Sequence, residues 1–476
     1  MKDEYKMTIG LEIHAELKTK SKMFCGCINL PEEKSPNIYI CPICMGHPGT
    51  LPVINKEAVK KVLLVGTALG SEIADFTEFD RKNYFYPDIP KGYQISQYKN
   101  PLVKGGSLVG VEITRVHLEE DTARSSHETP DMSLVDYNRA GVPLMELVTE
   151  PVIHSSEKAV EFAKEFQLLL QYLGVSDANM EKGEMRVEVN LSVSKTEDFG
   201  TKVEVKNINS FRAVGKAIDF EFDRQTTLLE KGEEVVQETR GWDENKEITF
   251  SQRLKESAHD YRYFEDPDLP KLIISEIPEF SKEELKKLLV ELPEEKRKRL
   301  TNDFSLKPED VEIYVGDREI GKFFESVAEG LSTYGAGIIK TASNYITSDI
   351  LGLSKALGKY FTLEKITKEN FIKLILMINK GNLSSRGAKD ILKIMFETGG
   401  DPEIIANEKG LIQKNNTEEI KLMAEKILKE NPMVVEEYKK GKESSLQFFI
   451  GQGMKETKGS INPEILKKII LELLQK

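Results

Sequence analysis

Long apolar segments are missing from this sequence of 476 residues. No run approaches the roughly 20 apolar residues that a helix needs to cross a bilayer. The first residues, Met1-Lys-Asp-Glu-Tyr5, also lack the apolar stretch of a signal peptide. Membrane and secreted proteins are therefore disfavoured, and we expect a cytoplasmic protein.

Positive charge is in deficit as well. Asp and Glu number 79, Lys and Arg number 67, and the net charge is −12. This balance argues against a protein that coats nucleic acid by bulk electrostatic attraction, although a local basic face is enough to bind RNA. Hydrophobic residues make up 39% of the chain, which is enough for real cores. The length is typical of roughly two to four domains.

Cysteine is scarce, and its placement is informative. The four cysteines form two short-spaced pairs, Cys25-Gly-Cys27 and Cys41-Pro-Ile-Cys44, with thirteen residues between the pairs. Four thiolates on tight turns can satisfy tetrahedral zinc, and a shell closed by four sulfurs favours a structural role. The alternative is four reduced, buried cysteines without a metal.

The first 290 residues are predicted to be a mixed region with many short strands. Alternating apolar and polar residues predict strands over 9–17 and 185–193, and a strand over 201–206 follows closely enough for an antiparallel hairpin. Helical spacing predicts helices over 156–173 and 210–231.

The remainder of the chain has a different character. From Ser281 onward Leu and Ile recur at helical spacing, and Gly399-Gly-Asp-Pro402 predicts a boundary near residue 405. The expected fold class is therefore α+β, with a strand-rich N-terminal region followed by helices.

Acidic residues share faces of the predicted strands. Glu12, His14 and Glu16 project to one side of the first strand, where they can hold a hard divalent cation. A solvated strand face is the alternative. Glu146 lies inside the apolar run Pro143–Val148, so its charge must be paired or coordinated if it is buried.

Basic residues are interleaved with further acidic ones. Glu188 shares a strand face with Arg186, and Glu204 shares one with Lys202 and Lys206. Acidic groups for a metal, next to Lys and Arg for phosphate oxygens, are what ATP-dependent transfer chemistry requires. A Walker-type glycine loop is absent, so any ATP site must be of a different kind.

Seven segments form a distinctive set: 9–17, 79–88, 117–121, 136–139, 200–207, 237–240 and 259–264. Through them the chain resembles the family of B subunits of the aspartyl/glutamyl-tRNA amidotransferases. The resemblance implies a mixed α/β cradle domain with antiparallel strands over 1–290, an all-α helical domain over 291–405 and a small all-α tail domain over 406–476.

The resemblance also implies an activity and partners. Members of this family use ATP and Mg²⁺ to phosphorylate the side-chain carboxylate of misacylated Glu-tRNA(Gln) or Asp-tRNA(Asn). Ammonia then displaces the phosphate, which makes the enzyme a carbon–nitrogen ligase with glutamine as the amide donor. In these heterotrimers the amidase-like A subunits are glutaminases that release the ammonia, and the small C subunits complete the assembly. The sequence leaves open which of the two tRNAs is used.

Site residues follow by position in the family motifs. Glu188 and Glu204 match acidic positions near the phosphorylation site. Lys82 and Lys91 resemble polar positions along the ammonia route, with ordinary surface lysines as the alternative. The implied ligands of Mg²⁺ are Glu12, His14, Glu120 and Glu146. Because strict alternation puts Glu120 opposite Glu119, the strand has to end or bulge there.

The tail and the cysteines fit the same family. Residues 406–476 contain thirteen Lys and eleven Glu, so they are slightly basic on an acidic background. The tail resembles the unit that grips the tRNA elbow, and Lys455 and Lys458 lie near glycines where backbone can approach a phosphate. A solvated helix end is the alternative. Cys25, Cys27, Cys41 and Cys44 match a zinc-bearing branch of the family.

Three rival interpretations remain. A non-catalytic, zinc-containing tRNA-binding scaffold would leave the carboxylates merely solvated. An archaeal paralogue of the family carries an inserted domain, for which 476 residues leave little room. A standalone glutamine amidotransferase is disfavoured because all four cysteines belong to the two pairs, which leaves no thiol nucleophile for glutamine hydrolysis.

Overall fold

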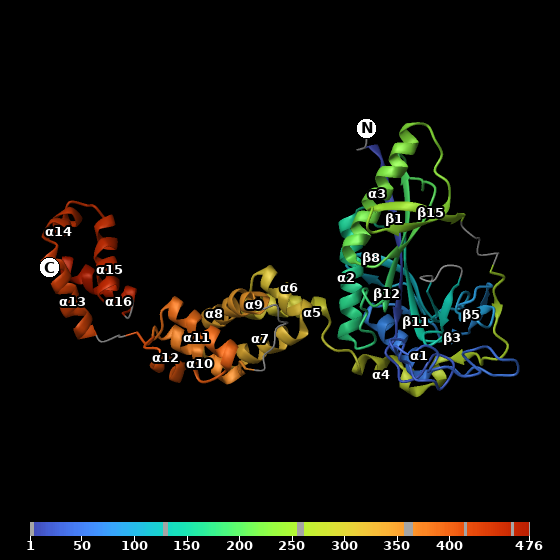
Figure 1. The fold of residues 1–476 in the computed structure, drawn as a ribbon, viewed down its shortest axis with the longest axis horizontal. Coiled ribbons are helices and arrows are strands. Elements are labelled where there is room, and N and C mark those ends of the chain that lie inside the picture. Colours follow the sequence, from blue (N-terminus) through green and yellow to red (C-terminus); the bar gives the residue numbers. More distant parts are fainter. Residues whose placement is uncertain are drawn as a thin grey trace. The chain divides into compact units, whose positions relative to one another are not determined.

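The computed structural model describes residues 4–126, 132–254, 261–356, 365–413, 417–457 and 461–475. The chain separates into two compact units, Met1–Pro293 and Glu294–Lys476 (Figure 1). The first unit is built on a sheet and the second is helical, which confirms the predicted α+β class. The predicted division into 1–290, 291–405 and 406–476 stays a prediction.

A sheet of ten strands organises the first unit. Neighbouring strands are antiparallel except β13 and β14, which run parallel. The predicted hairpin is confirmed by the antiparallel pairing of β12 with β13. In order across the sheet the strands are β15 (Ile248–Leu254), β14 (Glu238–Asp243), β13 (Val203–Ile208), β12 (Met185–Ser194), β1 (Lys6–Glu16), β11 (Pro143–Thr149), β8 (Val111–Glu120), β6 (Val103–Lys104) and β2 (Glu72–Ile73), and β7 (Ser107–Leu108) pairs with β8 off this path.

Three helices pack against this sheet: α1 (Lys56–Ala68), α2 (Ser156–Tyr172) and α3 (Phe211–Glu230) (Figure 1). Each begins where a side chain of Asn55, Ser155 or Ser210 accepts hydrogen bonds from backbone N–H groups of the first turn. The two helices predicted from the sequence are therefore confirmed, with their ends displaced by at most one residue.

Alternation along β1 decides which face carries the core. Ile9, Leu11 and Ile13 are fully buried in the core that the helices cover. Glu12 and His14, which alternate with them, project from the opposite face and are only partly buried. The sheet thus has one apolar face and one face that carries acidic side chains.

Short strands and turns complete the first unit. The strands β16, β4 and β5 form a three-stranded sheet, and two pairs, β9–β10 and β3–β17, form small ribbons. Their bounds are β3 (Phe76–Thr77), β4 (Asp80–Asn83), β5 (Tyr93–Ser96), β9 (Arg124–Ser126), β10 (Leu134–Asp136), β16 (Phe264–Glu265) and β17 (Leu272–Ile273), followed by α4 (Lys282–Lys287).

The described part of the second unit is almost wholly helical, with one isolated antiparallel bridge between Leu383 and Ile412. Its last helices share an apolar cluster that includes Ile427, Phe449, Leu466 and Ile470. The helices are α5 (Pro293–Phe304), α6 (Pro308–Gly316), α7 (Arg318–Leu331), α8 (Ala336–Asn344), a π-helical segment (Tyr345–Ile350), α9 (Leu351–Ala356), α10 (Lys368–Asn379), α11 (Ser385–Thr398), α12 (Pro402–Glu408), α13 (Thr417–Glu430), α14 (Pro432–Lys439), α15 (Ser444–Glu456) and α16 (Pro463–Leu474).

Candidate functional site

Five neighbouring strands, β13, β12, β1, β11 and β8, bring acidic and imidazole side chains together on the polar face of the sheet. The register pairs Glu12 of β1 with Glu188 of β12, and His14 of β1 with Glu146 of β11. Glu146 is paired in turn with His117 of β8. Paired residues point to the same face of a sheet, so these side chains form one patch. We call it the carboxylate–histidine cluster; its members are Glu12, His14, His117, Glu119, Glu146, Glu188 and Glu204.

The donor atoms of this cluster lie close together. Nε2 of His14 is 3.4 Å from Oε1 of Glu119, 3.4 Å from Oε2 of Glu146 and 3.8 Å from Oε1 of Glu12. Nε2 of His117 is 3.5 Å from the same Glu146 oxygen. Three sets have ligand atoms within 4.8 Å of one another: Glu12 with His14 and Glu146, His117 with Glu119 and Glu146, and Glu12 with Glu188 and Glu204.

Burial and mutual repulsion perturb the ionisation of these carboxylates. Burial, then the charges of Glu146 and Glu188, raise the pKa of Glu12 to about 7. Burial and Glu146 also raise the pKa of Glu119. Burial alone would raise the pKa of Glu146, but His117 and His14 hold it well below its usual range. A bound divalent cation would offset the mutual repulsion of these clustered carboxylates and favour their ionised forms.

The two histidines differ in charge. Burial lowers the pKa of His14, but the hydrogen bond to Glu146 and the nearby carboxylates outweigh it and raise the pKa to about 9. Burial lowers the pKa of His117 to about 4. The Nδ1 atoms of both are buried and have no hydrogen-bond partner within the described ranges. A neutral imidazole beside carboxylates is a metal ligand of the usual kind.

One ammonium group is held inside the cluster. Nζ of Lys206 lies 2.7 Å from Oε2 of Glu188 and 3.9 Å from Oε1 of Glu204. Thr239 donates a 2.7 Å hydrogen bond to the other oxygen of Glu204. Burial opposes the charge of Lys206, yet Glu188, Glu204 and Glu12 raise its pKa above the usual value. Glu188 and Glu204 are thus brought together around this lysine.

A second ammonium group borders the cluster. Nζ of Lys82, on β4, lies 5.0 Å from the ring centroid of Tyr261. Burial by itself would lower the pKa of Lys82, but acidic neighbours that include Glu119 and Glu146 raise it. Both ammonium groups therefore remain charged next to the carboxylates.

The structure places the predicted Mg²⁺ ligand Glu120 outside this cluster. The strand β8 does end at Glu120, but the buried Oε1 of Glu120 accepts hydrogen bonds from Nζ of Lys91 and, at 3.0 Å, from the backbone N–H of Ile95. Glu119 shares the face of His117 and lies in the cluster instead. Sequence reasoning chose neither His117 nor Glu119 as a ligand, although the two-residue period of the strand carried that signal.

A mainly apolar cavity of about 240 Å³ lies beside the cluster on the same face. Gly10 lies between Thr8 and Glu12 along β1, and its missing side chain leaves room over the strand. Phe199, which is 70% exposed, lines the cavity. Asn190 also lines it, and the buried Oδ1 atom of Asn190 has no hydrogen-bond partner in the described part of the chain.

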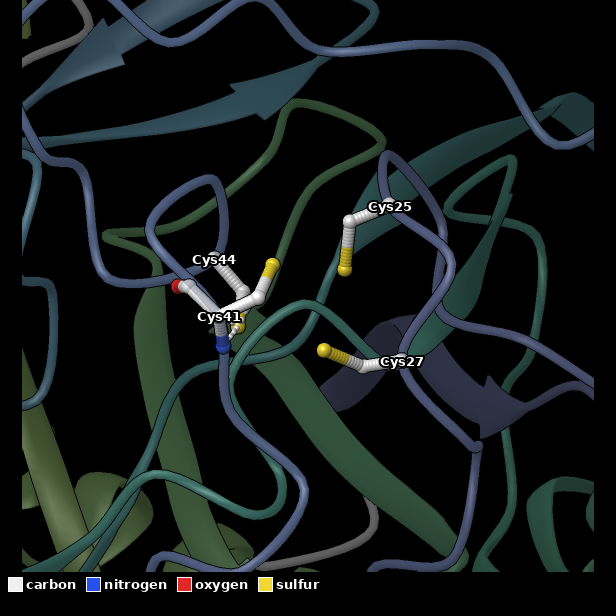
Figure 2. Close-up of side chains that lie close together, drawn as sticks. All are labelled: Cys25, Cys27, Cys41 and Cys44. Atoms are coloured by element: carbon white, nitrogen blue, oxygen red, sulfur yellow. Dashed lines mark hydrogen bonds between the residues drawn. The ribbon is translucent and has the colours of Figure 1, made fainter.

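The four cysteines form a second candidate site, which the spacing predicted. Figure 2 shows Cys25 and Cys27 on one side and Cys41 and Cys44 on the other, with their sulfurs facing a common space. All four Sγ atoms lie within 4.8 Å of one another, and those of Cys41 and Cys44 are 3.9 Å apart. Tetrahedral zinc with bonds of about 2.3 Å sets its sulfurs about 3.8 Å apart. The four cysteines could therefore hold a metal ion.

The electrostatics of the cysteines also suit a metal. A hydrogen bond from Cys25, opposed in part by burial, and the charge of Lys22 lower the pKa of Cys44 to about 5. The bond to Cys44 and burial raise the pKa of Cys25, while burial and Cys41 raise that of Cys27 to about 11. Cys44 is therefore the thiol that ionises most readily, and a thiolate is the form that binds zinc.

The two predicted tRNA-binding lysines lie in the second unit. Lys455 is exposed in the last turn of α15. Lys458 lies outside the described residues. No helix in the described ranges combines the length and the apolar character needed to cross a membrane.

Comparisons with known proteins identify the family. Residues 7–278 match the family described as GatB/GatE catalytic domain, and residues 322–474 match the one described as GatB domain. The chain belongs to the GatB family. This membership confirms the resemblance seen in the sequence, and the whole carboxylate–histidine cluster lies inside the region that matches the GatB/GatE catalytic domain.

Relatives of this GatB chain match it from end to end. They include proteins that are named as B subunits of aspartyl/glutamyl-tRNA(Asn/Gln) amidotransferases. The one from Carboxydothermus hydrogenoformans is 43% identical and covers 99% of both chains. The one from Thermoanaerobacter sp. (strain X514) is 44% identical over 99% of this chain and 100% of its own.

Proposed function

We propose that this GatB chain is the carboxylate-activating component of a tRNA-dependent amidotransferase. It uses ATP to phosphorylate the side chain of misacylated Glu-tRNA(Gln) or Asp-tRNA(Asn), and the product is the amide. The observation that carries this proposal is the convergence of carboxylates and imidazoles from five strands next to the ammonium groups of Lys206 and Lys82. The names of the full-length relatives agree with it.

The proposed reaction has two steps. An oxygen of the substrate carboxylate bonds to the γ-phosphorus of ATP, the bond from that phosphorus to the β,γ-bridging oxygen breaks, and ADP leaves. Ammonia nitrogen then bonds to the carbonyl carbon, the C–O bond to phosphate breaks, and the nitrogen loses a proton. Phosphorylation is needed because a free carboxylate offers only an oxide as leaving group.

The donor set fits a hard divalent cation, because carboxylate oxygens predominate in it. Glu12, His14 and Glu146, with Glu119 in place of Glu120, would hold Mg²⁺, and His14 would give up its proton when the ion binds. Bound Mg²⁺ would neutralise charge on the phosphoryl group as it transfers.

The lysines would act on the other phosphate oxygens. Glu188 and Glu204 fix the ammonium group of Lys206, which gives it one orientation for binding a phosphate. Lys82 offers a second charge from β4, near Glu119 and Glu146. Two fixed ammonium groups would orient the triphosphate and stabilise the charge that develops during transfer.

The cluster can be tested by removing one imidazole. His14→Ala is expected to lower tRNA-dependent ATP hydrolysis at least about 100-fold while tRNA affinity stays unchanged, because the imidazole contacts the metal-binding carboxylates and not the RNA. The assay uses the chain assembled with its partner subunits, and the control is His154→Ala, an exposed histidine whose Nδ1 lies 2.9 Å from the backbone oxygen of Met7. Full hydrolysis by His14→Ala with tRNA still bound would support a non-catalytic scaffold instead.

The apolar cavity is the proposed position of the ATP base. Its volume of about 240 Å³ is below the roughly 300–1,000 Å³ of pockets for drug-sized ligands, so it suits one planar base better than a whole nucleotide. Phe199 offers a face for stacking, and Asn190 offers a buried amide for a hydrogen bond. Since Asn190 is paired across the strands with Glu204, a member of the cluster, the base would lie directly beside the cluster.

Phe199→Ala is expected to weaken ATP binding by roughly 5- to 100-fold, since stacking of a base on an aromatic ring contributes about 1–3 kcal/mol. Calorimetric titration of the full-length chain with ATP measures this change. Inorganic triphosphate, which has no base, should bind the variant as it binds the unaltered chain. Phe76→Ala removes another exposed phenylalanine outside the cavity and serves as the control. If Phe199→Ala weakened the binding of ATP and of inorganic triphosphate equally, stacking of the base on Phe199 would be refuted.

The remaining assignments belong to the same proposal. An amidase-like glutaminase supplies ammonia, a small third chain joins the heterotrimer, and Lys82 and Lys91 border the route of the ammonia. The tail, with Lys455 and Lys458, contacts the backbone of the tRNA elbow by shape. Zinc at Cys25, Cys27, Cys41 and Cys44 has a structural role, because four thiolates leave no open position.

A further inference from the structure

Lys22 is a fully buried lysine without a carboxylate partner. It is 0% exposed, and its Nζ donates a 3.1 Å hydrogen bond to the backbone oxygen of Tyr137. The ion pairs of the described residues include no carboxylate for it, and the buried carboxylate of Glu120 is paired with Lys91. A buried ammonium group without an opposite charge is costly, so the anion that balances Lys22 has to be found nearby.

The sulfur of Cys44 lies beside this ammonium group. Nζ of Lys22 is 4.0 Å from Sγ of Cys44, and the backbone N–H of Cys41 donates to the same sulfur at 3.2 Å. Two donors therefore converge on one thiolate. Gly141 packs against both residues, because an added Cβ there would lie 3.6 Å from Cδ of Lys22 and 3.5 Å from Cβ of Cys44.

The charge of a loaded cysteine site explains this arrangement. Four thiolates around one divalent zinc ion leave a net charge of about −2 in a largely buried place. When zinc displaces protons from neutral thiols, the site gains this negative charge, and a fixed cation next to a sulfur stabilises the loaded state. An ammonium group at Cys44 therefore favours binding of the metal and fixes the direction of that sulfur.

We propose that Lys22 is a positioning residue of the cysteine site, which neutralises part of the charge of the tetrathiolate and orients Cys44 toward the metal. This inference rests on the proposed zinc at the four cysteines. It adds a cation from outside the cysteine motif, three residues before Cys25, to the group of residues that determine how tightly the metal is held.

Zinc affinity of the full-length chain tests this role. Lys22→Met removes the charge and the hydrogen bond to Tyr137, whereas Lys22→Gln removes the charge but keeps a donor. Both are expected to bind zinc about 10- to 100-fold more weakly in competition with a chromogenic chelator. Lys20→Met makes the same change at an exposed lysine in the same loop and should leave the affinity within about twofold.

Each outcome decides between the possibilities. If Lys22→Gln binds zinc as tightly as the unaltered chain, the charge has no role and the proposal is overturned. If Lys22→Met fails to fold, Lys22→Gln alone carries the test, with its far-ultraviolet circular dichroism compared with that of the unaltered chain. An unaltered chain that binds no zinc overturns the metal site itself, and the role of Lys22 with it, but leaves the proposed ATP chemistry standing.

Discussion

Glu146→Gln is expected to abolish metal binding at the carboxylate–histidine cluster and to lower tRNA-dependent ATP hydrolysis at least about 100-fold. Mutating residues that only orient metal ligands already lowers metal affinity or activity by about 10- to 100-fold, and Glu146 is proposed to be a ligand itself. Glu146 belongs to two of the three ligand sets, and both His14 and His117 lie within 3.5 Å of its Oε2. Glutamine keeps the volume and removes the charge. Mn²⁺, which carboxylates bind much as they bind Mg²⁺, reports affinity through the spin-resonance signal of the free ion.

The neighbouring pair Glu119 and Glu120 supplies a matched comparison. Glu119→Gln is expected to weaken Mn²⁺ binding, because Oε1 of Glu119 lies 3.4 Å from Nε2 of His14. Glu120→Gln, the same change one residue later, should leave Mn²⁺ binding unchanged, since Glu120 contacts Lys91 and Ile95 instead. The reverse order of effects would restore Glu120 as the ligand and contradict the arrangement of the cluster.

The sequence carried much of this site in advance. Period-two alternation along β1 separates Glu12 and His14 from Ile13, and a chain that must bury Ile13 has to present the other two on the far face. Glu146 was recognisable because a charge inside an apolar run needs a partner. The cysteine spacing likewise predicted that the four sulfurs converge, because two short-spaced pairs on turns are a usual way of supplying four ligands to one zinc ion.

Family motif and strand geometry point to different residues at positions 119 and 120. Both residues lie in the same matched segment, 117–121, so family position alone does not separate them. The strand does separate them, because adjacent residues project to opposite faces and His117 fixes which face belongs to the cluster. Alternation from His117 places Glu119 in the cluster, and the Mn²⁺ comparison of Glu119→Gln with Glu120→Gln decides which residue binds the metal.

Other features depend on contacts that no local pattern contains. Lys22 is buried because its ammonium group reaches the backbone of Tyr137, more than a hundred residues away. The cavity beside the cluster combines Gly10 of β1 with Phe199, which follows β12. Lysine is usually exposed and an isolated phenylalanine is usually core, so residue type alone predicts the wrong surroundings for both.

Loss of the cysteine metal is expected to lower stability rather than ATP chemistry. A cross-link that closes the segment from Cys25 to Cys44 restricts the unfolded chain by about 3 kcal/mol. At about 2–4 °C per kcal/mol for a unit of this kind, Cys41→Ser should lower the unfolding midpoint of the first unit by roughly 6–12 °C. Scanning calorimetry of the full-length chain, with and without a zinc chelator, measures the shift. Chelation should lower the midpoint of the unaltered chain and leave that of Cys41→Ser where it is.

The control for this change is Thr50→Ala in the same loop. It removes one hydrogen bond, from Oγ1 of Thr50 to the backbone oxygen of His47, which is worth about 0.5–1.5 kcal/mol. The cysteine loop is anchored through the backbone, where Met23 N–H donates to Gly141 at 2.7 Å, and not through any side chain of the carboxylate–histidine cluster. Folded Cys41→Ser should therefore bind Mn²⁺ as the unaltered chain does. A midpoint unaffected by both the substitution and the chelator would mean that no metal links the two cysteine pairs.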